Sequence, residues 1–96
     1  SWTSRGNMPT VALSPEWGIE ASEGLKASLA EHLDTADEVV LAAGEAGRVH
    51  SASIQVLTAF VRTRRQAGRS TRIAPCAAAV RDAAVSLGLA AELGLA

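Results

Sequence analysis

The sequence predicts an α/β domain whose central sheet is mostly parallel, with four to five strands and three to four helices. Short apolar runs alternate with segments of helical periodicity, and the run at residues 38–43 is apolar almost without interruption. Such alternation is typical of β-α-β units, in which a helix joins two parallel strands. A length of 96 residues fits one domain, and we expect that domain to span residues 1–96.

The first expected element is a strand at residues 10–14, which are short, mostly apolar and followed by Pro15. Gly6 and Asn7 are a turn signal, so the pattern also suggests a hairpin over residues 1–13. Two interpretations of residues 1–7 stay open. They belong to the native chain, or they are a disordered or foreign leader ahead of a native start at Met8.

Two further elements are indicated by the spacing of apolar residues. Leu25, Leu29 and Leu33 are four residues apart, which predicts one apolar face of a helix over residues 20–33. The run at residues 38–43 predicts a strand that is buried on both faces.

The second half repeats this pattern. Apolar positions recur with helical spacing from Ser51 onward and predict a helix that ends near Gly68, a C-terminal capping glycine. A strand at residues 70–74 is expected to end at Pro75, which can open a helix at residues 76–87. The apolar stripe of the longer helix comprises Ile54, Leu57, Phe60, Val61 and, at its end, Arg64.

Composition limits the classes of function. The net charge of −1 argues against a general nucleic-acid binder, and no run of 18 apolar residues is present that could span a membrane. Charge is segregated, since residues 1–46 hold eight acids and two bases while residues 47–96 hold seven bases and two acids. The lone Cys76 cannot form an internal disulfide, which indicates a reducing, cytoplasmic location.

No pattern predicts a cofactor, a metal site or an enzyme. His32, His50 and Cys76 lie on different expected elements and lack the spacing of zinc ligands. Ser51 follows His50, but the serine lacks the G-x-S-x-G context of a nucleophile. The arginine cluster lacks interleaved aromatic residues and is interpreted as a solvated helix end; it comprises Arg62, Arg64, Arg65, Arg69 and Arg72.

The segment "RVHSASIQVL", Arg48–Leu57, joins a buried strand to the longest helix. Either Ser51 or Ser53 can cap the helix by accepting a hydrogen bond from a backbone N–H. A helix N-terminus also attracts anions, and a phosphate on Ser51 would add about −1.5 to −2 charges there. Ser51 is therefore a cap, a phosphoacceptor or an interface contact, and the residues alone leave these alternatives open.

This segment and the residues on either side of it resemble the STAS domain, the fold of sulfate transporters and anti-sigma-factor antagonists. The family signature places V-x-x-[IV]-D-[ST]-[SA]-G-[LI] between a buried strand and a long helix, and residues 45–89 are similar in register. Positions that match the family ending are Gly68, Pro75, Val80, Gly88 and Leu89.

The resemblance implies that Ser51 stands at the first [ST] position, which is a phosphoacceptor in many members. Ala52 occupies the second position, His50 replaces the usual Asp, and Ser53 replaces the usual Gly. Two interpretations are open: a phosphorylation switch, or a docking surface that has lost the chemistry. The residues that we expect to contact a partner are Arg48, His50, Ser51, Ser53 and Gln55.

The resemblance further implies a bacterial, non-catalytic regulatory domain that binds proteins. An anti-sigma-factor antagonist would bind an anti-sigma factor of the GHKL kinase type and would be released by phosphorylation. The alternative is an MlaB-like accessory subunit that docks on the ATPase of a phospholipid-transport ABC system, or a degenerate chemotaxis-associated relative. Neither the residues nor the resemblance indicates an oligomeric state.

Overall fold

The computed structural model describes residues 10–95 and confirms the α/β class with a parallel sheet. Its elements are, in order, β1 (Thr10–Ala12), the 3-10 helix η1 (Ile19–Ala21), α1 (Ser22–Ala30), β2 (Val39–Ala43), α2 (Ser51–Gln66), β3 (Thr71–Cys76) and α3 (Ala78–Ser86). Within residues 10–95 the sheet has three strands, so the expected four to five are not found there. The expected hairpin over residues 1–13 falls largely on residues 1–9, outside the described residues.

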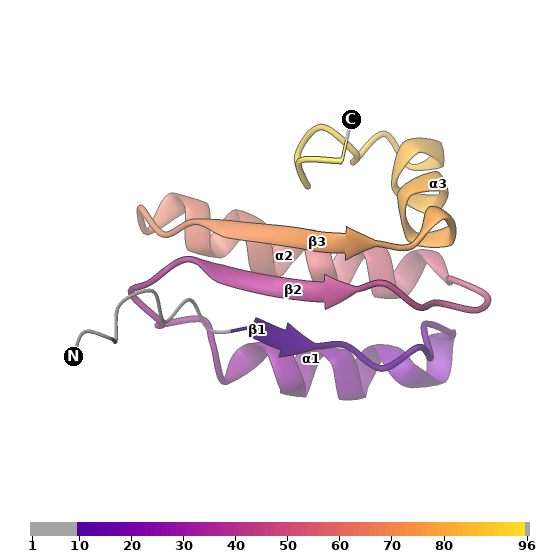
Figure 1. The fold of residues 1–96 in the computed structure, drawn as a ribbon, viewed down its shortest axis with the longest axis horizontal. Helices are drawn as coiled ribbons and strands as arrows, with labels where there is room; N and C mark the ends of the chain where they lie inside the picture. Colours follow the sequence, from indigo (N-terminus) through magenta and orange to yellow (C-terminus); the bar gives the residue numbers. More distant parts are fainter. Residues whose placement is uncertain (1–9, 96) are drawn as a thin grey trace.

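The strands lie in the order β1-β2-β3, and both neighbouring pairs are parallel. Right-handed crossovers that progress in one direction along a sheet place their helices on the same face. Figure 1 shows this arrangement, with α1 and α2 side by side behind the strands. The N-termini of both helices therefore lie at the edge of the sheet where the strands end. Within residues 10–95, none of the helices combines the length and the hydropathy that a membrane span requires.

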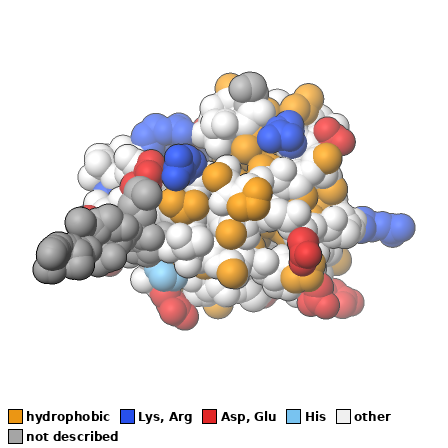
Figure 2. Space-filling view, viewed as in Figure 1, with side chains coloured by type: hydrophobic (Ala, Val, Ile, Leu, Met, Phe, Trp, Pro, Cys, Tyr) orange, Lys and Arg blue, Asp and Glu red, His pale blue; other side chains and the backbone are white. Residues whose placement is uncertain are grey.

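The prediction that β2 is a buried strand holds for four of its five residues, although the described helices cover only one face of the sheet. Val39, Leu41 and Ala43 are fully buried and belong to the core beneath the helices. The alternate residues Val40 and Ala42 point to the other face, where no described helix lies, and Figure 2 shows apolar side chains gathered there. Val40 is still only 8% exposed because it lies between neighbouring strands, so burial of consecutive residues did not require a second helical layer.

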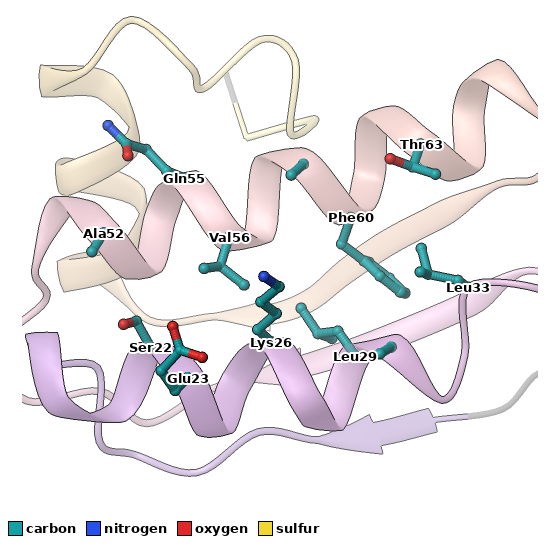
Figure 3. Close-up of a pocket in the computed structure, with 12 residues that line it drawn as sticks. Ser22, Glu23, Lys26, Leu29, Leu33, Ala52, Gln55, Val56, Phe60 and Thr63 are labelled. Carbon is teal, nitrogen blue, oxygen red and sulfur yellow. The ribbon is translucent and has the colours of Figure 1, made fainter.

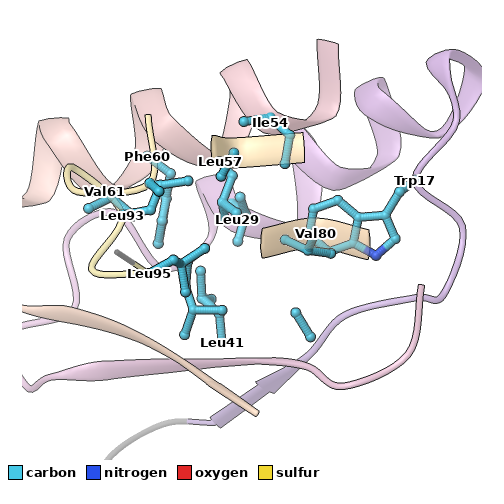
Figure 4. Close-up of a cluster of buried hydrophobic side chains, with 14 of the residues drawn as sticks. Trp17, Leu29, Leu41, Ile54, Leu57, Phe60, Val61, Val80, Leu93 and Leu95 are labelled. Carbon is cyan, nitrogen blue, oxygen red and sulfur yellow. The ribbon is translucent and has the colours of Figure 1, made fainter. Parts of the chain in front are cut away.

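The core lies between the sheet and the helices and is mostly aliphatic (Figure 4). Leu29 of α1 and the α2 stripe predicted from sequence, Ile54, Leu57, Phe60 and Val61, are all buried. The segment after α3 adds further apolar side chains to the same core, namely Ala90, Leu93 and Leu95. A core of small aliphatic side chains depends on close packing, because each side chain buries little area.

The start of the last helix differs from the prediction. Pro75 was expected to open that helix, with Cys76 in its first turn, but both residues belong to β3 and α3 begins at Ala78. The Ala74–Pro75 peptide is cis, and the pairing of β2 with β3 shifts register next to it. β3 lies at the edge of the sheet that residues 10–95 form, where a missing N–H and a local irregularity are tolerated.

The predicted capping glycine is confirmed. Gly68 has φ +78°, its N–H donates to the Arg65 carbonyl at 2.9 Å, and the Arg69 N–H donates to the Arg64 carbonyl at 2.7 Å. This is the Schellman pattern, which satisfies carbonyl groups left without partners at a helix end. The helix expected over residues 20–33 is shorter, because it starts as η1 and leaves α-helical geometry after Ala30.

Arg64 corrects the expectation that the arginine cluster is a solvated helix end. Its side chain is fully buried, and its guanidinium carbon lies 5.8 Å from the centre of the Phe60 ring. It donates hydrogen bonds to Oγ1 of Thr71 (2.8 Å) and to the carbonyls of His32 (2.8 Å), Leu33 (3.4 Å), Thr35 (2.8 Å), Asp37 (2.9 Å) and Ser70 (2.8 Å). Burial lowers the pKa of the guanidinium, and the carbonyl oxygens compensate its charge. Arg64 thus ties the connection after α1 to Ser70 and Thr71 at the start of β3.

Candidate functional site

The cap at the start of α2 is His50, not a serine. His50 has extended backbone geometry, and its Nδ1 accepts a hydrogen bond from the Ala52 N–H at 3.0 Å. The expectation that Ser51 or Ser53 caps the helix is therefore wrong. A ring nitrogen one residue before the helix reaches the same N–H groups that an Asp or Asn side chain reaches. His50 therefore caps α2 at the position where the family signature has aspartate.

Ser51 is the first residue of α2, and its side chain is exposed. The first turn of α2 contains no acidic residue, so the positive end of the helix dipole has no anionic side chain of its own helix nearby. The Ser51 hydroxyl can therefore be reached from outside, and an anion there would meet a favourable field.

Ser53 lies inside the protein and is withdrawn from the expected contact surface. It is fully buried, and its hydroxyl donates to the Trp17 carbonyl at 3.1 Å, with the Gly18 carbonyl at 3.4 Å. A glycine at this position would leave the Trp17 carbonyl without this bond. The family signature has glycine at this position, so Ser53 adds a hydrogen bond between the first turn of α2 and the Trp17 carbonyl.

Trp17 anchors the segment before α2 and was not singled out by the sequence. Its side chain is 1% exposed, it forms an isolated parallel bridge with Val49, and its carbonyl also accepts from the His50 N–H at 2.8 Å. A lone tryptophan between Pro15 and Gly18 was the available signal, because a large aromatic side chain in a loop is a natural anchor. It holds residues 49–53 against the strand ends.

The structure brings four of the five expected contact residues together on the surface. Arg48, His50, Ser51 and Gln55 are all exposed at the N-terminal end of α2. Gln55 follows Ser51 by four residues, which places the two side chains on one face of the helix. We call these four residues the α2-start surface.

A groove of 480 Å³ between α1 and α2 continues from this surface (Figure 3). Ala52 and Gln55 line one end of it beside Ser22 and Glu23 of α1. The remaining lining residues are mostly apolar and include Leu29, Ala30, Leu33, Val56, Ala59 and Phe60. Sequence reasoning did not identify this groove, because it depends on how two helices lie against each other.

The other chemically interesting residues do not gather into a site. Within residues 10–95, no group of three or more His, Cys, Asp and Glu residues could hold a metal ion. Cys76 is half-buried, and burial raises the pKa of its thiol, which opposes formation of the reactive thiolate. The contribution of His32 is its backbone carbonyl, which Arg64 binds.

The comparison with protein families decides the class of domain. The family model described as "Mlab, STAS domain" matches residues 2–95, nearly the whole chain. The chain belongs to this STAS family. A comparison with curated proteins and one with solved structures find no significant match. STAS domains are typically protein-interaction modules, and members of the family are generally non-enzymatic.

In this STAS domain the signature positions have distinct structural roles. His50, at the Asp position, caps α2, and Ser51, at the [ST] position, points outward from its first turn. Ser53, at the Gly position, binds the Trp17 carbonyl from below. Both departures from the family letters therefore support the backbone around Ser51 through hydrogen bonds.

Proposed function

We propose that this STAS domain is a non-catalytic regulatory module that docks on a protein partner through the α2-start surface, with Ser51 as its phosphoacceptor. The observation that carries the proposal is that Ser51 is exposed and is the first residue of α2. The residues on either side of it are held by hydrogen bonds, His50 to the Ala52 N–H and Ser53 to the Trp17 carbonyl. Of the two serines near the start of α2, only Ser51 is exposed and accessible to a second protein.

A phosphate fits this place energetically. The dipole and the N–H groups at a helix N-terminus favour negative charge, by about 0.3–1 kcal/mol at an exposed position. The phosphorylated domain would keep its fold, because Ser51 contributes no buried contact. The same phosphate would disturb a complex, since its charge and its volume would have to be accommodated within the contact surface.

Intact-mass measurement tests the acceptor role after incubation with the kinase encoded beside the gene. We expect one added phosphate on the native chain and none on Ser51→Ala. Phosphate appearing equally on Ser51→Ala would refute the assignment.

A charge-mimicking variant tests the switch. Ser51→Glu is expected to lose partner binding while it unfolds at no lower denaturant concentration than the native chain. Ser86→Glu, at an exposed serine of α3, is the matched control and should bind normally. Equal loss in both variants would indicate a general charge effect and remove the switch.

The second candidate is an accessory subunit of a phospholipid-transport ABC system, and the description of the matching family favours it. Here the same surface would dock on the ATPase without phosphorylation. We expect purified ATPase to be retained by the native domain, and Ser51→Ala to weaken the complex with no phosphate in either protein. Retention that is unaffected by Ser51→Ala would argue against docking through this surface.

A small hydrolase that used Ser51 as nucleophile and His50 as base would be an enzyme, and it makes the opposite prediction. His50 Nδ1 is engaged by the Ala52 N–H, so the ring is oriented toward the backbone. A serine-reactive fluorophosphonate probe is expected to leave Ser51 unlabelled at neutral pH. Stoichiometric labelling that His50→Ala abolishes would overturn the non-catalytic assignment.

A further inference from the structure

We propose that a cleft at the C-terminal end of α2 binds the phosphate group of a phosphate monoester, through the guanidinium groups of Arg65 and Arg69 and the hydroxyl groups of Ser70 and Thr71. This cleft, which we call the α2-end cleft, lies where the chain passes from α2 to β3, at the opposite end of α2 from Ser51 (Figure 1). Its residues all differ from those of the α2-start surface, so the two sites can be tested separately.

The size and the lining of the α2-end cleft suit a small hydrophilic ligand. Its volume is 420 Å³, within the range of small-molecule sites, about 300–1,000 Å³. Among the described residues the lining includes no acid and no aromatic side chain on which a nucleobase could stack. The lining residues are Val61, Arg65, Gly68, Arg69, Ser70 and Thr71.

The two arginines of the cleft are not neutralised by the nearby Glu92. Both carboxylate oxygens of Glu92 accept hydrogen bonds from Arg62, at 2.6 and 2.9 Å. Arg65 donates to the backbone carbonyl of Glu92, and its Nη1 stays 3.9 Å from the carboxylate. Arg69 is half-buried and forms no ion pair with any residue from 10 to 95. The Glu92 carboxylate is therefore in close contact with Arg62 only.

A third guanidinium lies on the inner side of the cleft. The buried Arg64 donates to Thr71 and to carbonyl oxygens, and no carboxylate is among its acceptors in the described part of the chain. Burial, and then repulsion from Arg69, lower the pKa of the Arg64 guanidinium. An anion beside Arg69 would offset that repulsion.

The negative charges near the cleft do not cancel the two arginines that line it. The C-terminal end of a helix carries only about half an elementary negative charge. Asp37 and Glu38 lie in the connection before β2, and neither lines the cleft or forms an ion pair with its arginines. The cleft therefore favours an anionic ligand over a neutral one.

The donor groups match a tetrahedral anion. Thr71 Oγ1 accepts from Arg64 Nε at 2.8 Å, which leaves the hydroxyl proton of Thr71 available for another acceptor. Ser70 adds an exposed hydroxyl group beside it. Guanidinium groups bind phosphate oxygens through two parallel N–H bonds. A phosphate monoester, with three terminal oxygens and about −1.5 to −2 charges, can use all four donor groups, whereas a carboxylate offers two oxygens and one charge.

NMR titration of the ¹⁵N-labelled chain with glycerol 3-phosphate, at constant ionic strength, tests the site. We expect saturable shifts of the backbone amides of residues 68–71 and of the Nε–H signals of Arg65 and Arg69, with a Kd of about 1 mM or lower. Acetate should produce no saturable shift. Absence of saturable shifts with glycerol 3-phosphate, or equal saturation by acetate, would refute the site.

Matched variants separate the cleft from a general charge effect. Arg69→Gln and Arg65→Gln should each weaken binding about tenfold, because each removes charge-assisted hydrogen bonds to the phosphate. Arg72→Gln removes the same charge from an exposed residue of β3 that does not line the cleft, and it should leave the Kd within about twofold. Similar losses in Arg69→Gln and Arg72→Gln would overturn the assignment.

A second arm distinguishes a soluble phosphate monoester from the same group on a lipid. Phosphatidylcholine vesicles that contain phosphatidic acid present a phosphate monoester at a membrane surface. Co-sedimentation that Arg69→Gln abolishes and Arg72→Gln retains would assign the cleft to a lipid headgroup. Binding of glycerol 3-phosphate without co-sedimentation would assign it to a soluble ligand.

Discussion

The two ends of α2 differ in what the chain itself supplies to them. At the C-terminal end, the buried Arg64 makes hydrogen bonds to five carbonyl groups and one hydroxyl group from two connecting segments. At the N-terminal end, the helix is capped by one side chain, His50, whose Nδ1 accepts a hydrogen bond from the Ala52 N–H, and Ser51 is exposed. One helix thus combines an internal anchor with an end that is open to a second molecule.

Helix electrostatics explains the contrast. Carbonyl groups at helix C-termini favour a cation, and Arg64 places one in the last turn of α2. N-termini favour an anion, but the first turn of α2 has no acidic residue and its cap is a histidine. No acidic side chain of the first turn of α2 therefore occupies the position that favours negative charge. A phosphate on Ser51, as proposed, would occupy it.

The largest loss of stability is expected when the Arg64 side chain is removed. Arg64→Met would leave several partly buried carbonyls without donors, and we expect it to cost about 3 kcal/mol or more of unfolding free energy, measured by urea denaturation. Arg64→Lys should restore only part of this loss, because an ammonium cannot reach both connecting segments as the planar guanidinium does. Arg72→Met, at an exposed position of β3, is the control and should stay within about 0.5 kcal/mol. Equal stability of Arg64→Met and Arg72→Met would contradict the anchor.

At the N-terminal end of α2, Ser53 and Ser51 are predicted to differ in their contribution to stability. Ser53→Ala removes a buried hydrogen bond to the Trp17 carbonyl and should lower the unfolding free energy by about 1–2 kcal/mol. Ser51→Ala, two residues earlier and exposed, should change it by less than about 0.5 kcal/mol. The reverse order in chemical denaturation would show that Ser51, not Ser53, supports the fold.

His50 should have an intermediate effect. His50→Ala removes the cap of α2 and is expected to cost about 1 kcal/mol, while His50→Asp should retain the stability because Asp caps and also suits the dipole. Thermal unfolding at neutral pH measures both. If His50→Asp destabilises as much as His50→Ala, the histidine is needed for something other than capping.

The smallest effect is expected where α2 meets the C-terminal segment. Arg62, through its hydrogen bond and charge, lowers the pKa of the Glu92 carboxyl. The contribution of the pair to stability is therefore fully present above the ordinary pKa of Glu, about 4.3, and is lost as the pH falls through the lowered value. The stability difference between the native chain and Glu92→Gln should accordingly vanish in acid, as measured by denaturation at about pH 7 and about pH 2. A difference that persists in acid would assign the effect to packing.

The success of sequence reasoning depended on how local each feature is. The α2 stripe and the Gly68 cap were predicted correctly, because helical periodicity and a positive φ are set by neighbouring residues. Pro75 misled the prediction, because the local preference for a helix start was outweighed by pairing of β3 with β2. The same holds for Ser53, which looked like an exposed cap and is buried by a loop 36 residues away.

The sequence by itself determined the alternation of strands and helices, the family register and the position of Ser51 at a helix start. These depend on spacing along the chain, which the letters record directly. Only the tertiary structure decided that Arg64 is an internal anchor, that His50 rather than a serine is the cap, and that α1 and α2 leave a groove beside Ser51. Each of these depends on which distant groups come within hydrogen-bonding or packing distance, and crossovers on one face of a parallel sheet create those contacts.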